Sequence, residues 1–118
     1  MASKRQEQIA ELLKRNFGIV LRDKGSYIYG NAFVTVTSAA VTPDLSLAKL
    51  YISVYNTENK EEVLERIRRH IGPLKGDLGH RIKRHVRRVP NLSVFLDDTL
   101  DEMYKLNKIF DDLGGEEE

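Results

Sequence analysis

Apolar side chains recur at three- and four-residue steps in the first part of the chain. The series is Ile9, Leu12, Leu13, Phe17 and Val20, and this spacing is typical of one face of an amphipathic helix. We therefore predict a helix over residues 3–21. The residues that follow, 23–31, include two glycines, a serine and two tyrosines without a clear period, which predicts a loop.

The apolar period then changes to two. Residues 32–41 are rich in β-branched side chains, and residues 48–55 alternate between apolar and polar positions, as strands do. Between these segments lie Pro43 and Asp44, which favour a turn because proline fixes its φ and the carboxylate can bond to nearby backbone. The pattern predicts an antiparallel hairpin with one buried face.

A second helix is predicted from Asn59 to about Ile71. Asn59 followed by Glu62 resembles an N-cap with its reciprocal carboxylate, and apolar residues then recur at helical spacing. We expect Gly72 and Pro73 to end this helix. The physical reason is that proline offers no amide hydrogen to the preceding turn.

A third helix is predicted from about Lys75 to Pro90. At about 100° per residue, its apolar side chains fall within an arc of about 80°, and its cations and histidines occupy an opposite arc of about 160°. We expect the apolar stripe to pack on the sheet and the cationic face to meet solvent. The apolar set is Leu78, Ile82, Val86 and Val89, and the cationic set is His80, Arg81, Lys83, Arg84, Arg87 and Arg88.

The end of the chain adds a strand, a helix and a tail. Residues 92–96 form a short apolar run, and Thr99 with Glu102 has the spacing of a capping box for a last helix that ends near Leu113. The predicted fold is α+β, a single domain over residues 1–113 with helices on one face of a three-stranded sheet. Residues 114–118 are expected to be a flexible acidic tail.

The composition limits the possible classes of protein. The chain has 118 residues, the size of one domain, and it has no cysteine, which excludes a disulfide framework and a thiol nucleophile. No apolar run reaches the roughly 18 residues that a membrane span requires, and the start has no apolar signal-peptide core. We expect a cytoplasmic monomer that contacts no membrane.

The charges are distributed unevenly along the chain. The net charge is only +1, but residues 1–96 hold 17 Lys+Arg against 9 Asp+Glu, whereas residues 97–118 hold 2 against 9. Positions 80–89 contain no acid at all. Like charges at helical spacing repel one another, so this density of cations favours a polyanionic partner such as RNA over an ordinary solvated surface.

Two alternatives remain at this point. The first is a generic module for single-stranded RNA, in which tyrosines of the hairpin such as Tyr51 and Tyr55 are weak candidates for stacking on bases. The second is a protein-interaction domain whose acidic C-terminal segment folds back and screens the basic residues. Deletion of residues 111–118 distinguishes the second alternative, because an internal counter-charge predicts a loss of stability, whereas an RNA-binding face predicts unchanged folding and equal or tighter RNA binding.

Three further patterns are interpreted as non-functional. The GxxG pattern at residues 76–79 resembles a phosphate clamp, but it contains Asp77, which would repel phosphate, and Leu78 belongs to the apolar stripe. The three histidines have no thiolate partners, and His80 and His85 point about 140° apart on a helix. The paired aspartates at 97–98 and 111–112 form no catalytic constellation, so we expect no metal, no cofactor and no enzymatic activity.

Three stretches together resemble a known family, the bacterial ribosome-binding factor A proteins. They are VTVTSAAVTPDLSLAKLYISV at 34–54, LGHRIKRHVRRVPNL at 78–92 and FLDDTLDEM at 95–103, and the resemblance covers nearly the whole chain. It implies a KH-like fold of type II, with a kink between the two central helices at Gly72 and Pro73 and without a working GxxG clamp.

The resemblance also implies a function and a set of site residues. Members of this family are not enzymes; they bind ribosomal RNA of the immature small (30S) subunit, assist its late maturation and rRNA processing, and matter most in the cold. The RNA-facing residues implied here are Lys75, His80, Arg81, Lys83, Arg84, Arg87 and Arg88.

Overall fold

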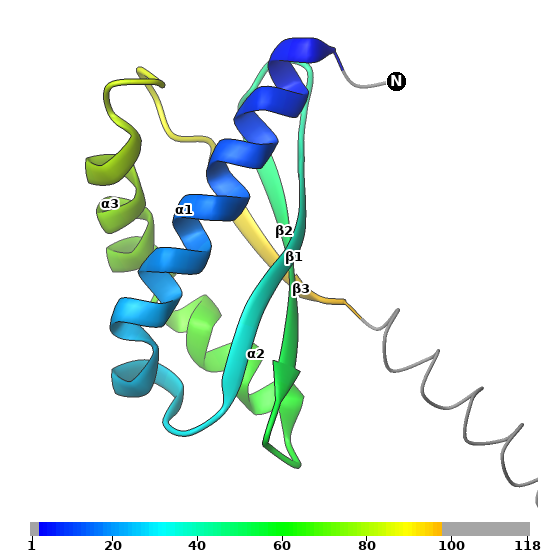
Figure 1. Cartoon of the computed structure of the whole chain (residues 1–118), viewed down its shortest axis with the longest axis vertical. Helices are drawn as coiled ribbons and strands as arrows, with labels where there is room; N and C mark the ends of the chain where they lie inside the picture. Colours follow the sequence, from blue (N-terminus) through cyan, green and yellow to red (C-terminus); the bar gives the residue numbers. More distant parts are fainter. Residues whose placement is uncertain (1–2, 98–118) are drawn as a thin grey trace, which may run out of the picture.

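Three helices cover one face of a three-stranded sheet in the computed structural model, which describes residues 3–97 (Figure 1). The strand order is β1-β2-β3, with β1 and β2 antiparallel and β2 and β3 parallel. The α+β architecture predicted from the sequence is therefore confirmed, while the predicted helix from Thr99 to Leu113 and the tail lie outside the described residues. The elements are α1 (Lys4–Tyr29), β1 (Phe33–Val41), β2 (Leu47–Tyr55), α2 (Lys60–Arg69), α3 (Ile71–Ile82) and β3 (Asn91–Leu96).

The core lies between the sheet and the helices, and β2 is its centre. Ala48, Leu50 and Ile52 of β2 are fully buried, and Val54 is nearly so. The intervening residues of β2 point to the opposite face, as the period-two pattern of the sequence predicted. The helices complete the core with Leu13, Phe17 and Leu21 of α1, Ile67 of α2, and Leu74, Leu78 and Ile82 of α3.

Helix α1 is longer than predicted, because it continues through residues 23–29, which we expected to form a loop. The buried positions simply continue the helical spacing through Leu21, Gly25 and Ile28. Gly25 leaves room for the ring of Tyr29, whose hydroxyl donates a hydrogen bond to the Leu21 carbonyl oxygen at 3.1 Å. Burial of this ring raises the pKa of the Tyr29 hydroxyl. The packing of Tyr29 explains why a glycine is compatible with the helix here.

The junction between α2 and α3 lies at His70 and not at Gly72 and Pro73. His70 caps the end of α2, where its N–H donates to the carbonyl oxygens of Arg66 and Ile67, and α3 begins at the next residue. Gly72 and Pro73 consequently belong to the first turn of α3. A proline is tolerated there because the first amides of a helix have no partner within it. The junction between the two helices therefore lies two residues before the position that was predicted for the kink.

Helix α3 ends at Ile82, so the expectation of one helix from Lys75 to Pro90 was wrong at both ends. Residues 83–90 form a turn and an irregular segment, which we call the connection. Its end is fixed by the sheet, since the Asn91 N–H donates to the Ser46 carbonyl oxygen at 2.9 Å where β3 joins β2. The chain must leave the helical layer to reach this point, and a continued helix could not do so.

The connection nevertheless keeps its valines inward. Val86 and Val89 are partly buried and pack against the core. Val89 lies directly over α3, because a Cβ atom placed on Gly79 would come within 3.1 Å of the Val89 Cγ2 atom. The division between apolar and cationic positions was therefore predicted correctly, although the backbone that presents them is not a helix.

Two glycine substitutions test the packing of the Tyr29 ring on Gly25 within α1. In Gly76→Ala the new methyl group meets no atom within 4 Å, so the free energy of unfolding should rise by about 0.5–1 kcal/mol from helix propensity alone. In Gly25→Ala the methyl group would overlap the Tyr29 ring, so this gain should be cancelled or reversed. Urea denaturation measures both, and an equal stabilisation by the two substitutions would contradict the packing.

Candidate nucleic-acid interface

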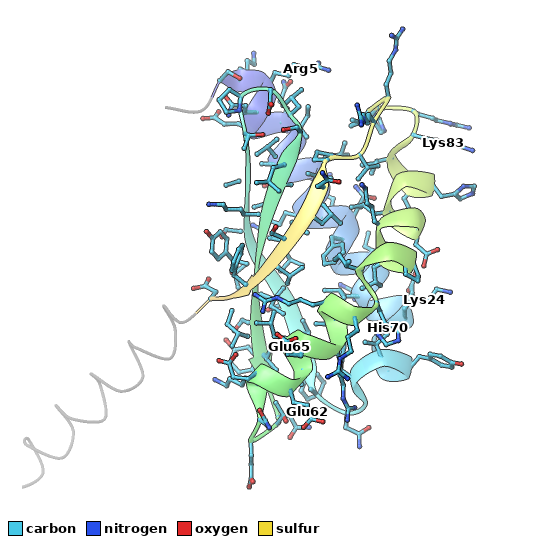
Figure 2. All side chains as sticks on the ribbon, turned by 180° about the vertical axis from the view of Figure 1, so that it is seen from behind. Arg5, Lys24, Glu62, Glu65, His70 and Lys83 are labelled. Atoms are coloured by element: carbon cyan, nitrogen blue, oxygen red, sulfur yellow. The ribbon has the colours of Figure 1, made fainter. Side chains whose placement is uncertain are left out.

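Five cations gather around the C-terminal end of α3 and along the connection. We call them the basic ridge: Arg81, Lys83, Arg84, Arg87 and Arg88. All five are exposed. Arg81 belongs to the last turn of α3, and Lys83, which Figure 2 labels, marks the point where the chain leaves the helix. The sequence placed these residues together correctly, but it assigned them to the face of a rigid helix instead of a turn.

The ridge carries charge that the rest of the described chain does not cancel. Within residues 3–97, two arginines of α2 pair with glutamates on their own helix, Arg66 with Glu62 at 2.7 Å and Arg68 with Glu65 at 3.0 Å. None of the five ridge residues forms an ion pair with a carboxylate of this part of the chain. Exposed like charges without counter-charges produce a positive potential available to a polyanion.

Hydrogen bonds to uncharged side chains hold one ridge cation, Arg81, and the neighbouring Lys75 against other elements. The Arg81 Nε atom donates to the Asn16 Oδ1 atom of α1 at 3.2 Å. Lys75, which is partly buried, donates from Nζ to the Asn91 Oδ1 atom at the start of β3 at 3.1 Å. Both partners are uncharged, so the position of each cation is restrained while its charge remains. Asn16 and Asn91 were not singled out in the sequence, because only the tertiary fold brings them to these cations.

Histidines and glycines do not form a site of their own. His80 is exposed beside the ridge on α3, His85 lies in the connection, and His70 is at the α2–α3 junction, where its Nδ1 atom lies 2.8 Å from the Arg66 carbonyl oxygen. No group of three or more potential metal ligands occurs among residues 3–97. The GxxG pattern at 76–79 lies inside α3, so it cannot act as a loop that clamps phosphate, as the sequence indicated.

The tyrosines suggested for base stacking lie on the open face of the sheet, away from the helical layer. Tyr51 pairs with Phe95 of β3, their ring centroids 5.7 Å apart, and the Arg68 guanidinium lies 5.7 Å from the centroid of the Phe95 ring. The same Arg68 donates two hydrogen bonds to the Val94 carbonyl oxygen, at 2.7 and 3.1 Å. The Tyr51 and Phe95 rings therefore contact each other, and Arg68 lies beside Phe95, whereas the ridge residues belong to α3 and the connection.

The described helices include none that is both long and apolar enough to cross a membrane.

Comparison with known proteins shows which family the chain belongs to. The family model described as "Ribosome-binding factor A" matches residues 5–110. The chain belongs to the ribosome-binding factor A family. Curated relatives agree: a ribosome-binding factor A of Cytophaga hutchinsonii is 36% identical over 101 residues, covering 86% of this chain and 76% of the relative.

Other members of the ribosome-binding factor A family support the same relationship. The protein of Flavobacterium johnsoniae is 35% identical over 111 residues, covering 91% of this chain and 83% of its own. The crystal structure of ribosome-binding factor A from Thermus thermophilus superposes with a TM-score of 0.64 at 21% identity, covering 77% of this chain and 94% of that one. The fold is KH-like, as the resemblance implied.

A further solved structure carries information on a partner. It is a model of the Thermus thermophilus ribosome-binding factor A fitted into a cryo-EM map of a 30S complex, and it superposes with a TM-score of 0.60 at 21% identity. It covers 75% of this chain and 90% of that one. At this identity the similarity establishes the shared fold.

Two arginine substitutions compare an arginine that makes contacts within the fold with one that makes none. Arg68→Gln removes both hydrogen bonds to Val94 and the contact with Phe95, so it should lower the free energy of unfolding by about 1 kcal/mol or more. Arg84→Gln removes no hydrogen bond or ion pair within residues 3–97 and should stay within about 0.5 kcal/mol of the unsubstituted protein. Chemical denaturation at low salt measures both. A large loss in Arg84→Gln would show that the ridge is already paired within the molecule.

Proposed function

We propose that this protein is a non-enzymatic assembly factor that binds ribosomal RNA of the immature small (30S) ribosomal subunit. In this proposal it assists late maturation and rRNA processing, with its greatest importance in the cold, and it acts in the cytoplasm as a monomer. The observation that carries the proposal is the basic ridge, whose five exposed cations find no counter-charge in residues 3–97. Family membership and the relative fitted into a 30S complex support the choice of partner.

The ridge has the chemistry that an RNA backbone requires. Guanidinium groups match phosphate oxygens in a bidentate geometry, and four of the five ridge residues are arginines. Lys75 and His80 border the ridge and add one charge and one titratable ring. Phosphate contacts position a protein on RNA but do not read its sequence. We therefore propose that the ridge recognises the arrangement of phosphates in one RNA conformation.

Such recognition is sufficient for an assembly factor. A ligand shifts an equilibrium only by the difference between its affinities for the two states. If phosphates of the immature subunit are spaced to match the ridge, binding stabilises that conformation, and the protein leaves when maturation changes the spacing. No bond is made or broken in this mechanism, so no catalytic residue is needed.

Salt dependence and charge reversal test this function together. If all five ridge cations meet phosphates, log Kobs for small subunits should fall against log[salt] with a slope of about −3.5 to −4.5. Replacing Arg84, Arg87 and Arg88 with glutamate should abolish co-sedimentation with small subunits at moderate salt, because three contacts become repulsions. Circular dichroism should remain unchanged, since these side chains form no hydrogen bond or ion pair in the described fold.

The control reverses the same number of charges elsewhere. Arg15, Lys49 and Arg66 are exposed residues of α1, β2 and α2, and their replacement by glutamate should leave most of the binding intact. Equal losses in the two triple variants would mean that net charge alone governs association, which would refute the ridge as the binding surface. Equal affinity for unstructured oligonucleotides and for immature subunits would instead favour the generic single-stranded RNA module.

A further inference from the structure

A hollow of about 450 Å³ lies at the end of the ridge, where distant segments of the chain meet. Its lining comes from the first turn of α1, the turn between β1 and β2, the connection, Lys75 of α3 and Asn91 of β3. In Figure 2 the labelled Arg5 and Lys83 lie at the same end of the molecule, which is the end that carries the hollow. This volume is within the roughly 300–1,000 Å³ of pockets that bind small ligands.

Cations form one part of the lining. They are Arg87 and Arg88 of the connection, Lys75 of α3, and Arg5 of α1. Arg5 is more than eighty positions from Arg87 in the sequence, and no sequence pattern singled it out. Arg5 is exposed and, like the ridge, forms no ion pair within residues 3–97. An anion in the hollow can therefore be approached by guanidinium groups from two different elements.

The lining also includes a carboxylate that stays charged. The Oδ1 atom of Asp44 accepts hydrogen bonds from the Thr42 and Ser46 hydroxyls, both at 2.7 Å, and from the Ser46 N–H at 3.1 Å. These bonds hold the pKa of Asp44 below its usual value, and the bond from Thr42 contributes most. Asp44 places one negative charge in a lining that otherwise carries cations, so it offers an acceptor for an N–H donor next to groups that attract an anion. The hollow therefore suits a ligand that combines an anion with N–H donors.

Apolar surface completes the lining. Leu45, Val86 and Val89 are partly buried and Pro90 is buried. An unpaired nucleobase can pack between apolar side chains in a pocket. Anion, donor and flat ring occur together in one nucleotide. A base that is paired and stacked in a helix cannot place its ring in the hollow, so an unpaired nucleotide is required to bring all three.

We propose that this hollow binds one unpaired nucleotide whose base carries an exocyclic amino group. Its phosphate faces Arg5, Arg87 and Arg88, and its amino group donates to Asp44. Carboxylates accept from the amino group of cytosine in this way, whereas uracil presents a carbonyl oxygen at the same position. The inference deepens the proposed function, on which it rests, by adding to the ridge a point at which one base is selected.

Titration of the full-length ¹⁵N-labelled protein with mononucleotides tests the hollow without using ribosomes. Cytidine monophosphate should cause saturable shifts of the amide signals of residues 5, 44–46 and 85–89 at low salt. Uridine monophosphate should bind at least about fivefold more weakly, the lower end of the discrimination that a base-edge contact provides. Inorganic phosphate should cause no saturable change at residues 44–46.

Three variants assign the contacts. Arg5→Gln should weaken binding of cytidine monophosphate several-fold, because it removes a charge-assisted bond. Arg15→Gln changes another arginine of α1, whose side chain is 70% exposed outside the hollow, and should have no effect. Asp44→Asn retains an acceptor for the Thr42 and Ser46 bonds, yet it should remove the preference for cytidine over uridine, because the amide can also donate.

The outcomes separate this inference from the proposed function. Equal responses to both nucleotides and to phosphate would overturn it, as would the absence of shifts in the hollow. In either case, salt-dependent association of the same protein with small subunits would leave the proposed function standing. Conversely, selective binding of cytidine monophosphate by a protein that fails to associate with small subunits would support the hollow and refute the ribosomal role.

Discussion

The parallel pairing of β3 with β2 is the constraint on which the rest of this structure depends. A hairpin can join antiparallel strands, but two parallel strands start at the same end of the sheet. The chain between them must therefore leave the sheet and return to that end as a crossover. Here α2 and α3 form the crossover. Helix α2 lies mainly against β3 and α3 mainly against α1, and both add buried side chains to the core that includes Leu50 and Ile52 of β2. The return must reach Asn91 beside Ser46. The connection is the segment that makes this return.

This geometry places the basic ridge where it is. The connection lies on α3 through Val89, which approaches Gly79, and through Val86, which packs on the core. With the valines held inward, the intervening arginines face solvent. The return toward the hairpin also brings the connection close to the first turn of α1 and to the β1–β2 turn, which creates the hollow. The ridge and the hollow therefore have a single structural cause.

Much of this could be predicted from the sequence where periodicity is local. The alternation of β2, the Asn59 cap, whose Oδ1 atom accepts from the Glu62 N–H at 3.0 Å, and the inward orientation of Val86 and Val89 follow from near neighbours. The errors have two causes. Helix α1 continues past Gly25 on a local signal that the glycine obscured, because the buried positions keep helical spacing and Tyr29 packs on Gly25 within the same helix. Helix α3 ends at Ile82 for a tertiary reason, because β3 must pair with β2. The position of Arg5 beside the connection has no local signal at all.

The central claim is that binding to small subunits requires the fold to hold the ridge in position, and that the charge of the ridge alone is not enough for this binding. Gly79→Leu tests it most directly, because a side chain there displaces Val89 and the connection while every cation is retained. Gly76→Leu, on the same helix with no atom near its Cβ position, is the control. Co-sedimentation with small subunits should weaken several-fold in Gly79→Leu and not in Gly76→Leu, with both proteins folded by circular dichroism. Unchanged binding by Gly79→Leu would contradict the account.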